Sequence, residues 1–159
     1  MAEVLFYHLT ESTLEEALPG LLERSLGRGW RAVVQTGSEE RRDALDTHLW
    51  SFRDDSFLAH GTDHDPHAAD QPVLLTVGTG NANGAQIRFM VDGAAPPDVA
   101  EYERAVFMFD GHDMVQVEAA REHWKTVKAA GHAVTYWQQT PDKRWERKAG
   151  LPHLHHGIG

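Results

Sequence analysis

The side chains best suited to chemistry gather on one predicted helix near the end of the chain. A cationic and aromatic face is formed by four residues at spacing i, i+3, i+4 and i+7, namely Arg121, Trp124, Lys125 and Lys128. An arginine guanidinium can bind a carboxylate through two hydrogen bonds, and lysines attract neighbouring acidic groups. An indole ring can line an apolar pocket. This face predicts a site for an acidic peptide with an apolar anchor. The same spacing also fits a core tryptophan whose edge is covered by lysine stems.

The charge along the chain is uneven. The 159 residues carry 15 basic and 24 acidic side chains, a net charge of −9. Residues 1–120 hold 8 basic and 21 acidic side chains (8 − 21 = −13), whereas residues 121–150 hold 7 and 3 (7 − 3 = +4). A basic quarter on an acidic body favours an acidic partner and argues against coating of nucleic acid by the whole surface. Chance clustering on a solvated helix face is the alternative.

A second set of potential ligands lies in the segment 60–70. It contains three histidines and three aspartates, His60, Asp63, His64, Asp65, His67 and Asp70. These side chains could bind a metal, although their spacing fits no defined motif and the composition is that of a solvated loop. A metal-dependent or nucleotide-binding α/β enzyme using this segment is the alternative function.

The motifs that would support catalysis are missing from the sequence. The first predicted strand is followed by H-L-T-E-S without a glycine, and the glycine loop at 78–84 leads into a strand. Neither fits the dinucleotide fingerprint, so the loop is predicted to be a surface turn. The chain has no cysteine, which excludes thiolate zinc sites and cysteine nucleophiles. We expect no catalytic residues, no cofactor and no bound metal.

The elements that position these residues alternate between strand and helix. Strands are predicted at 4–9, 30–35, 73–77, 86–91, 105–109 and 133–137, and helices at 14–26, 38–50 and 113–130. This alternation predicts an α/β fold with a mostly parallel sheet of five or six strands. Residues 1–140 are expected to form one domain, and residues 141–159 a flexible C-terminal extension.

The apolar segments are short. None approaches the ~20 residues that span a bilayer, and the first residues carry an acid where a secretory signal carries a base. We therefore expect a cytoplasmic protein that does not contact membranes.

Several short segments, in this order and at this spacing, resemble the chi subunit family of bacterial DNA polymerase III. They lie at 4–9 (VLFYHL), 49–50 (LW), 55–61 (DSFLAHG), 84–86 (GAQ), 91–94 (VDGA), 120–125 (AREHWK) and 130–132 (AGH). The resemblance covers about residues 1–140. It implies a three-layer α/β/α Rossmann-like fold without a nucleotide site.

The resemblance also implies a role and partners. Family members are accessory subunits in the clamp-loader part of the replicase, whose nucleotidyl transfer resides in another subunit. They hold the acidic C-terminal tail of single-stranded-DNA-binding protein, here at Arg121, Trp124, Lys125 and Lys128, with tryptophan where the family often has tyrosine. They also bind the small psi subunit, here at Trp50 and Phe57, two aromatics that a core role would explain equally. Contact with DNA would be mainly indirect.

Overall fold

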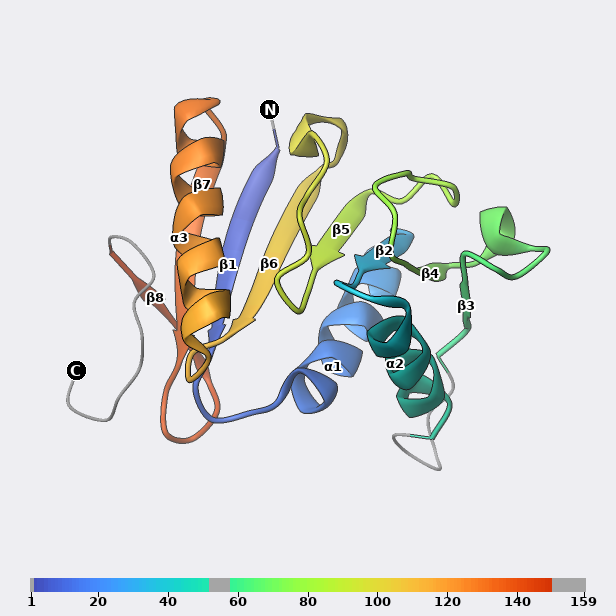
Figure 1. The fold of residues 1–159 in the computed structure, drawn as a ribbon, viewed down its shortest axis with the longest axis horizontal. Helices are drawn as coiled ribbons and strands as arrows, with labels where there is room; N and C mark the ends of the chain where they lie inside the picture. The colour runs from blue at the N-terminus through green and yellow to red at the C-terminus, as the bar shows by residue number, and fades with distance from the viewer. Residues whose placement is uncertain (1, 52–57, 150–159) are drawn as a thin grey trace.

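The computed structural model describes residues 2–51 and 58–149 (Figure 1). Within these ranges helices alternate with strands as expected. The helices are α1 (Leu14–Gly27), α2 (Glu39–Ser51) and α3 (Met114–Ala129), with short 3-10 turns at Ala68–Asp70 and Val99–Glu101. The strands are β1 (Glu3–Leu9), β2 (Ala32–Gln35), β3 (His60–Thr62), β4 (Val73–Thr76), β5 (Ile87–Met90), β6 (Arg104–Asp110), β7 (Ala133–Gln139) and β8 (Trp145–Lys148).

The strands form one sheet in the order β3-β4-β2-β5-β6-β1-β7-β8. Every pairing from β3 to β7 is parallel, and β8 pairs antiparallel with β7. The mostly parallel α/β fold is thus confirmed, but the expected five or six strands were too few. Strands β3 and β8 are three and four residues long and polar, so neither shows the apolar pattern that identifies a buried strand. The expected boundary at residue 140 falls inside the β7–β8 hairpin.

The sheet lies between two helical layers. Alternate strand residues such as Leu5 and Val106 pack with α1 and α2, and their neighbours Phe6 and Phe107 pack with α3 on the opposite face. Figure 1 shows α3 against β1, β6 and β7, and α1 beside α2 towards the other end of the sheet. This is the three-layer arrangement that the resemblance implied.

Helix α1 starts where its sequence predicts. Thr13 and Glu16 form a capping box, in which Glu16 N donates to Thr13 Oγ1 (3.2 Å) and Thr13 N donates to Glu16 Oε1 (2.9 Å). Leu18 and Leu22 are then fully buried one helical turn apart. Capping and burial together orient the β1–α1 loop at the carboxyl end of the sheet.

On the α3 side of the sheet, α3 does not extend over β2 and β4, and loops cover these strands instead. A buried arginine anchors one of these loops. The side chain of Arg88, on β5, is fully buried. Its guanidinium donates to Gln35 Oε1 (2.7 and 3.2 Å), Tyr102 Oη (2.9 Å) and the carbonyls of Gly78 (2.8 Å) and Gly80 (2.9 Å). The glycine loop that the sequence indicated as a simple surface turn is therefore anchored to the sheet.

Candidate functional site

A cavity of about 400 Å³ opens between α3, β7 and β8. Aromatic, aliphatic and cationic residues from all three elements line it, namely Trp124, Lys128, Val134, Thr135, Tyr136, Arg147, Lys148 and Ala149. Helix α3 is positioned by Asp113, whose carboxylate accepts from Val115 N at 2.9 Å and caps the first turn. Burial of its apolar stripe then turns Trp124 and Lys128 towards β7.

Trp124 belongs both to the core edge and to the cavity wall. Its ring packs edge-on against Phe6 (5.4 Å between centroids) and Tyr136 (6.3 Å). It remains half-buried, and Lys128 Nζ lies 5.6 Å from its ring centroid. A cation over an indole face is held by the ring's electrostatic quadrupole, which keeps the ammonium at the mouth of the cavity. The core interpretation and the binding interpretation of this residue are therefore compatible.

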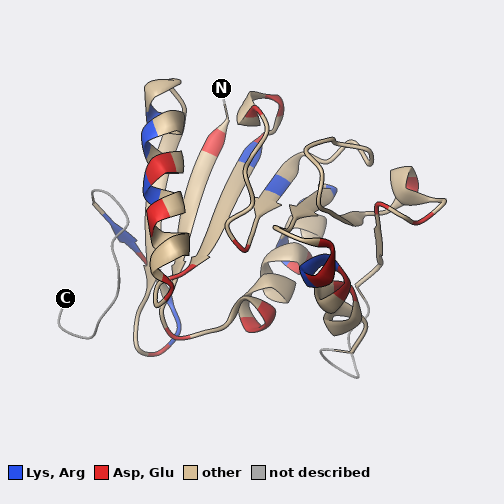
Figure 2. Ribbon diagram, viewed as in Figure 1, with Lys and Arg blue, Asp and Glu red and all other residues tan. Residues whose placement is uncertain are grey.

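The other two residues of the predicted face lie outside the cavity. Arg121 is half-buried one turn earlier on α3, and Lys125 is 59% exposed with Nζ 3.5 Å from Glu122 Oε1. An exposed pair of this kind contributes little to stability, so the lysine is available to a partner. Figure 2 shows blue residues alternating with red ones along α3, and blue residues on β8, the two elements that flank the cavity. The cationic surface thus extends along α3 from Arg121 to the cavity.

Strand β8 brings two further basic residues, Arg147 and Lys148, to the cavity, as the basic run that follows α3 in the sequence suggested. Lys148 lies opposite Tyr136 in the β7–β8 ladder, on the sheet face that α3 covers. Its Nζ is 2.6 Å from Glu146 Oε1. The excess of positive charge after residue 140 was visible in the sequence, but only the hairpin register puts it next to α3.

The second expected surface is described only in part. Trp50, in the last turn of α2, is 55% exposed, and its ring centroid lies 4.4 Å from that of His60. Such exposure fits a surface anchor better than a core residue. Phe57, the other residue of this patch, lies outside the described residues.

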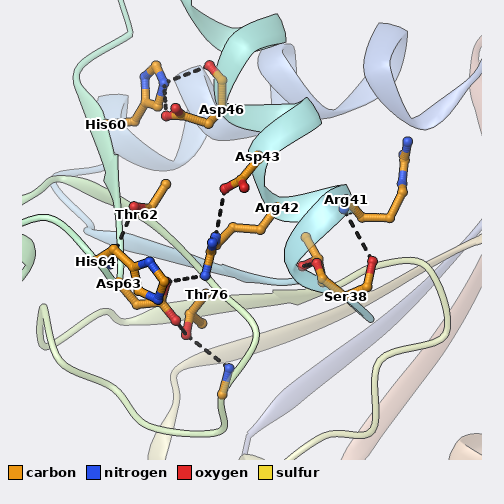
Figure 3. Close-up of polar contacts among 12 residues, drawn as sticks. Ser38, Arg41, Arg42, Asp43, Asp46, His60, Thr62, Asp63, His64 and Thr76 are labelled. Atoms are coloured by element: carbon orange, nitrogen blue, oxygen red, sulfur yellow. Dashed lines mark hydrogen bonds and ion pairs between the residues drawn. The ribbon is translucent and has the colours of Figure 1, made fainter.

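Residues 60–70 tie α2 to the edge of the sheet (Figure 3). Buried His60 is the first residue of β3, with Nδ1 2.7 Å from Leu58 O and Nε2 3.1 Å from Asp46 Oδ1. Asp63 accepts from Arg42 Nη1 (2.9 Å) on α2. In the ranges 2–51 and 58–149 no three His, Asp or Glu side chains are grouped as metal ligands. The alternative enzyme hypothesis therefore gains no geometric support from this segment.

Backbone donors beside the crevice where Rossmann-like proteins bind phosphate are bonded to a side chain of this chain. A cavity of about 420 Å³ lies at the carboxyl ends of β1 and β6, from which α1 and α3 start on opposite faces. There the backbone N–H groups of Thr10, Glu11 and Ser12 all donate to Gln139 Oε1, at 3.2, 3.0 and 2.9 Å. An anion would have to displace this amide before it could reach the loop.

No described helix combines the length and apolar character needed to cross a membrane. Together, fold and site define a Rossmann-like α/β protein that presents a cationic, aromatic-lined cavity beside the edge of its sheet. Residues 1–135 match the family model described as DNA polymerase III chi subunit, HolC, and the chain belongs to this family. It is thus an accessory subunit of DNA polymerase III, a protein of DNA replication. The cavity residues from β8 lie beyond the matched range.

Two curated relatives carry the same description. A probable DNA polymerase III subunit chi of Rickettsia prowazekii (strain Madrid E) is 26% identical over 101 residues, which are 64% of this chain and 59% of that protein. The DNA polymerase III subunit chi of Pseudomonas aeruginosa is 25% identical over 112 residues, 70% of this chain and 77% of that protein. The match thus spans less than two thirds of the Rickettsia relative.

Proposed function

We propose that the protein is a non-catalytic adaptor that links the clamp-loader part of DNA polymerase III to single-stranded-DNA-binding protein. It does so by gripping the acidic C-terminal tail of that protein in the cavity between α3, β7 and β8. The observation that carries the proposal is the combination of Trp124 and Lys128 in one cavity on an otherwise acidic chain. Nucleotidyl transfer is left to another subunit, and the adaptor works in the cytoplasm with the replicase.

The chemistry of the cavity suits a tail that ends in a hydrophobic residue. The apolar end can pack against Trp124, Val134 and Tyr136, where burial of an aromatic side chain contributes most. Its carboxylates then face the ammonium groups of Lys128 and Lys148 at the rim.

The charge distribution favours one direction for the peptide. Arg121 and Lys125 continue the cationic surface along α3, while the acidic body repels the rest of the tail. The preceding acids of the tail therefore run along α3 rather than across the sheet. Contact with DNA is mainly indirect, through the bound protein.

Arg121→Ala is expected to weaken binding of an acidic, Phe-terminated peptide by about 1.5–3 kcal/mol, because it removes a charge-assisted hydrogen bond. Lys128→Ala tests the cavity itself and should also weaken binding. Isothermal titration calorimetry measures both. The matched control is Arg144→Ala, which removes one positive charge from a side chain that is 83% exposed in the β7–β8 turn. If all three variants bind the acidic peptide as tightly as wild type does, the cavity between α3, β7 and β8 is not the binding site of the tail.

We further propose that Trp50 anchors a second partner, the psi subunit or an equivalent clamp-loader component. An acidic rim beside Trp50 would favour a partner with an apolar anchor and a basic rim. Asp46 lies one turn before Trp50 on α2, and Asp54 and Asp55, the other acids expected at this rim, lie outside the described residues. This surface is far from the α3 cavity in the sheet order, since α2 packs on β3 and β4. The two partners can therefore bind at the same time.

Trp50→Ala is expected to abolish capture of the psi-type partner while the melting temperature stays close to that of wild type, as for an exposed anchor. Pull-down and thermal melting on the same variant measure the two effects. Arg121→Ala is the control, because it should keep psi capture and weaken tail binding. A large fall in melting temperature would show that Trp50 is structural and would remove this surface.

A further inference from the structure

A small, arginine-lined pocket lies on the opposite side of the sheet from α3, where α1 ends and β6 begins. Its volume is about 100 Å³. Three arginines and several apolar side chains form its walls. The lining residues are Tyr7, Leu21, Arg24, Ser25, Arg28, Ile87, Phe89, Arg104 and Val106. The pocket shares no residue with the α3 cavity, so it does not depend on the function proposed above.

One indole positions two of the guanidinium groups. The Arg28 Cζ lies 4.3 Å and the Arg104 Cζ 5.4 Å from the ring centroid of Trp30. Trp30 is itself held by the turn after α1, where its backbone N–H donates to Ser25 O at 3.2 Å. Stacking on an aromatic face restricts a guanidinium while leaving N–H groups available along its edge. Arg28 and Arg104 come from different elements, so the tertiary fold assembles this pair.

The positive charge in this pocket is only partly compensated. Arg104 Nε is 2.5 Å from Glu3 Oε1, but Arg24 and Arg28 make no ion pair with any residue in the described part of the chain. On α2, by contrast, Arg41 and Arg42 each contact two carboxylates. Like charges held close together repel, and an anion between them would remove that cost.

Tyr7 supplies a neutral donor on the same pocket. Burial raises the pKa of Tyr7, and the positive charges of Arg104 and Arg24 oppose this shift. Tyr7, Arg24 and Arg104 line the same pocket, and the raised pKa means that the phenol of Tyr7 keeps its proton at neutral pH. A protonated hydroxyl beside guanidinium groups is a suitable donor set for a tetrahedral oxyanion.

We propose that this pocket, formed by Tyr7, Arg24, Arg28 and Arg104, binds a single phosphate group. Arginine forks match phosphate oxygens by paired hydrogen bonds, and the apolar floor strengthens the attraction by excluding water. The volume accommodates one phosphate and excludes the base and sugar of a nucleotide, which would have to lie outside. The phosphate is therefore either a monoester of a small molecule or a diester of a nucleic-acid strand.

The test is a titration of the full chain with inorganic phosphate, followed by the Nε–Hε signals of arginine in NMR spectra. Saturable shifts confined to the pocket arginines are expected, together with a rise in melting temperature. Arg28→Gln should weaken binding at least tenfold, and Arg24→Gln provides a second variant. Arg144→Gln, which removes the same charge from an exposed turn, should bind as wild type does.

Two further probes identify the source of the phosphate. Thymidine 5′-monophosphate presents a monoester, and a short oligothymidylate without terminal phosphates presents only diesters. Arg28-dependent binding of either supports the site and assigns its ligand. The proposal would be overturned if none of the three probes saturates. It would also be overturned if Arg144→Gln weakens binding as much as Arg28→Gln does, or if an acidic peptide binds the pocket as tightly as phosphate.

Discussion

Arg88→Met is expected to lower the free energy of unfolding by about 3–5 kcal/mol, because it removes a fully buried donor that makes five hydrogen bonds. All five N–H groups of the Arg88 guanidinium are used, and none of the acceptors is a carboxylate. Methionine fills much of the same volume, so the loss is mainly one of hydrogen bonds. Urea denaturation monitored by circular dichroism measures it.

The conservative change Arg88→Lys tests whether the positive charge of the side chain or the planar shape of the guanidinium matters for stability. Lysine keeps the positive charge but cannot reach Gln35, Tyr102 and the glycine carbonyls with one planar fork. It should therefore be almost as destabilising as methionine. Arg144→Met, at an exposed turn, is the control and should change stability by less than about 0.5 kcal/mol. A loss below about 1 kcal/mol for Arg88→Met would contradict the anchoring role.

Gln139→Ala is expected to lower the free energy of unfolding by about 2–4 kcal/mol, since three N–H groups of the β1–α1 loop lose their acceptor. The side chain also donates from Nε2 to Ser12 Oγ at 2.9 Å, so both ends of the amide are used. The effect should be local as well as global. Hydrogen exchange at Thr10, Glu11 and Ser12 should accelerate more than exchange in the core strands.

Gln139→Glu is the matched variant for this loop. A carboxylate oxygen can accept the same three N–H bonds, so this variant should retain most of the stability that alanine loses. If the two variants are equally destabilised, the acceptor oxygen is not what holds the loop.

Local signals in the sequence were sufficient for much of the fold. The buried strands β1, β2, β4, β5 and β6 are short apolar runs, and the start of α1 is marked by Thr13 and Glu16 within one turn. The contribution of α3 to the candidate cavity followed from the helical spacing, because Trp124 and Lys128 are one helical turn apart. These features depend on residues a few positions from one another.

The features that escaped prediction depend on contacts between distant parts of the chain. Gln139 meets Thr10 across 129 positions, and Arg88 meets Gln35 across 53. A lone polar residue at the end of a strand, or a lone arginine inside one, carries no local signal of its partner. Strand β8 was missed for the same reason, since its polar residues become a strand only by pairing with β7.

The position of β8 also bears on how the sheet ends. A strand at the edge of a sheet exposes unpaired backbone groups, to which another chain can add by strand pairing. Here the two outermost strands are the three-residue β3 and the four-residue β8, and three of the four residues in β8 are charged. Strand β8 covers the end of the seven-residue β7, which would otherwise offer a long template for aggregation. The same short hairpin that lines the cavity thus helps keep the protein from self-association at its sheet edge.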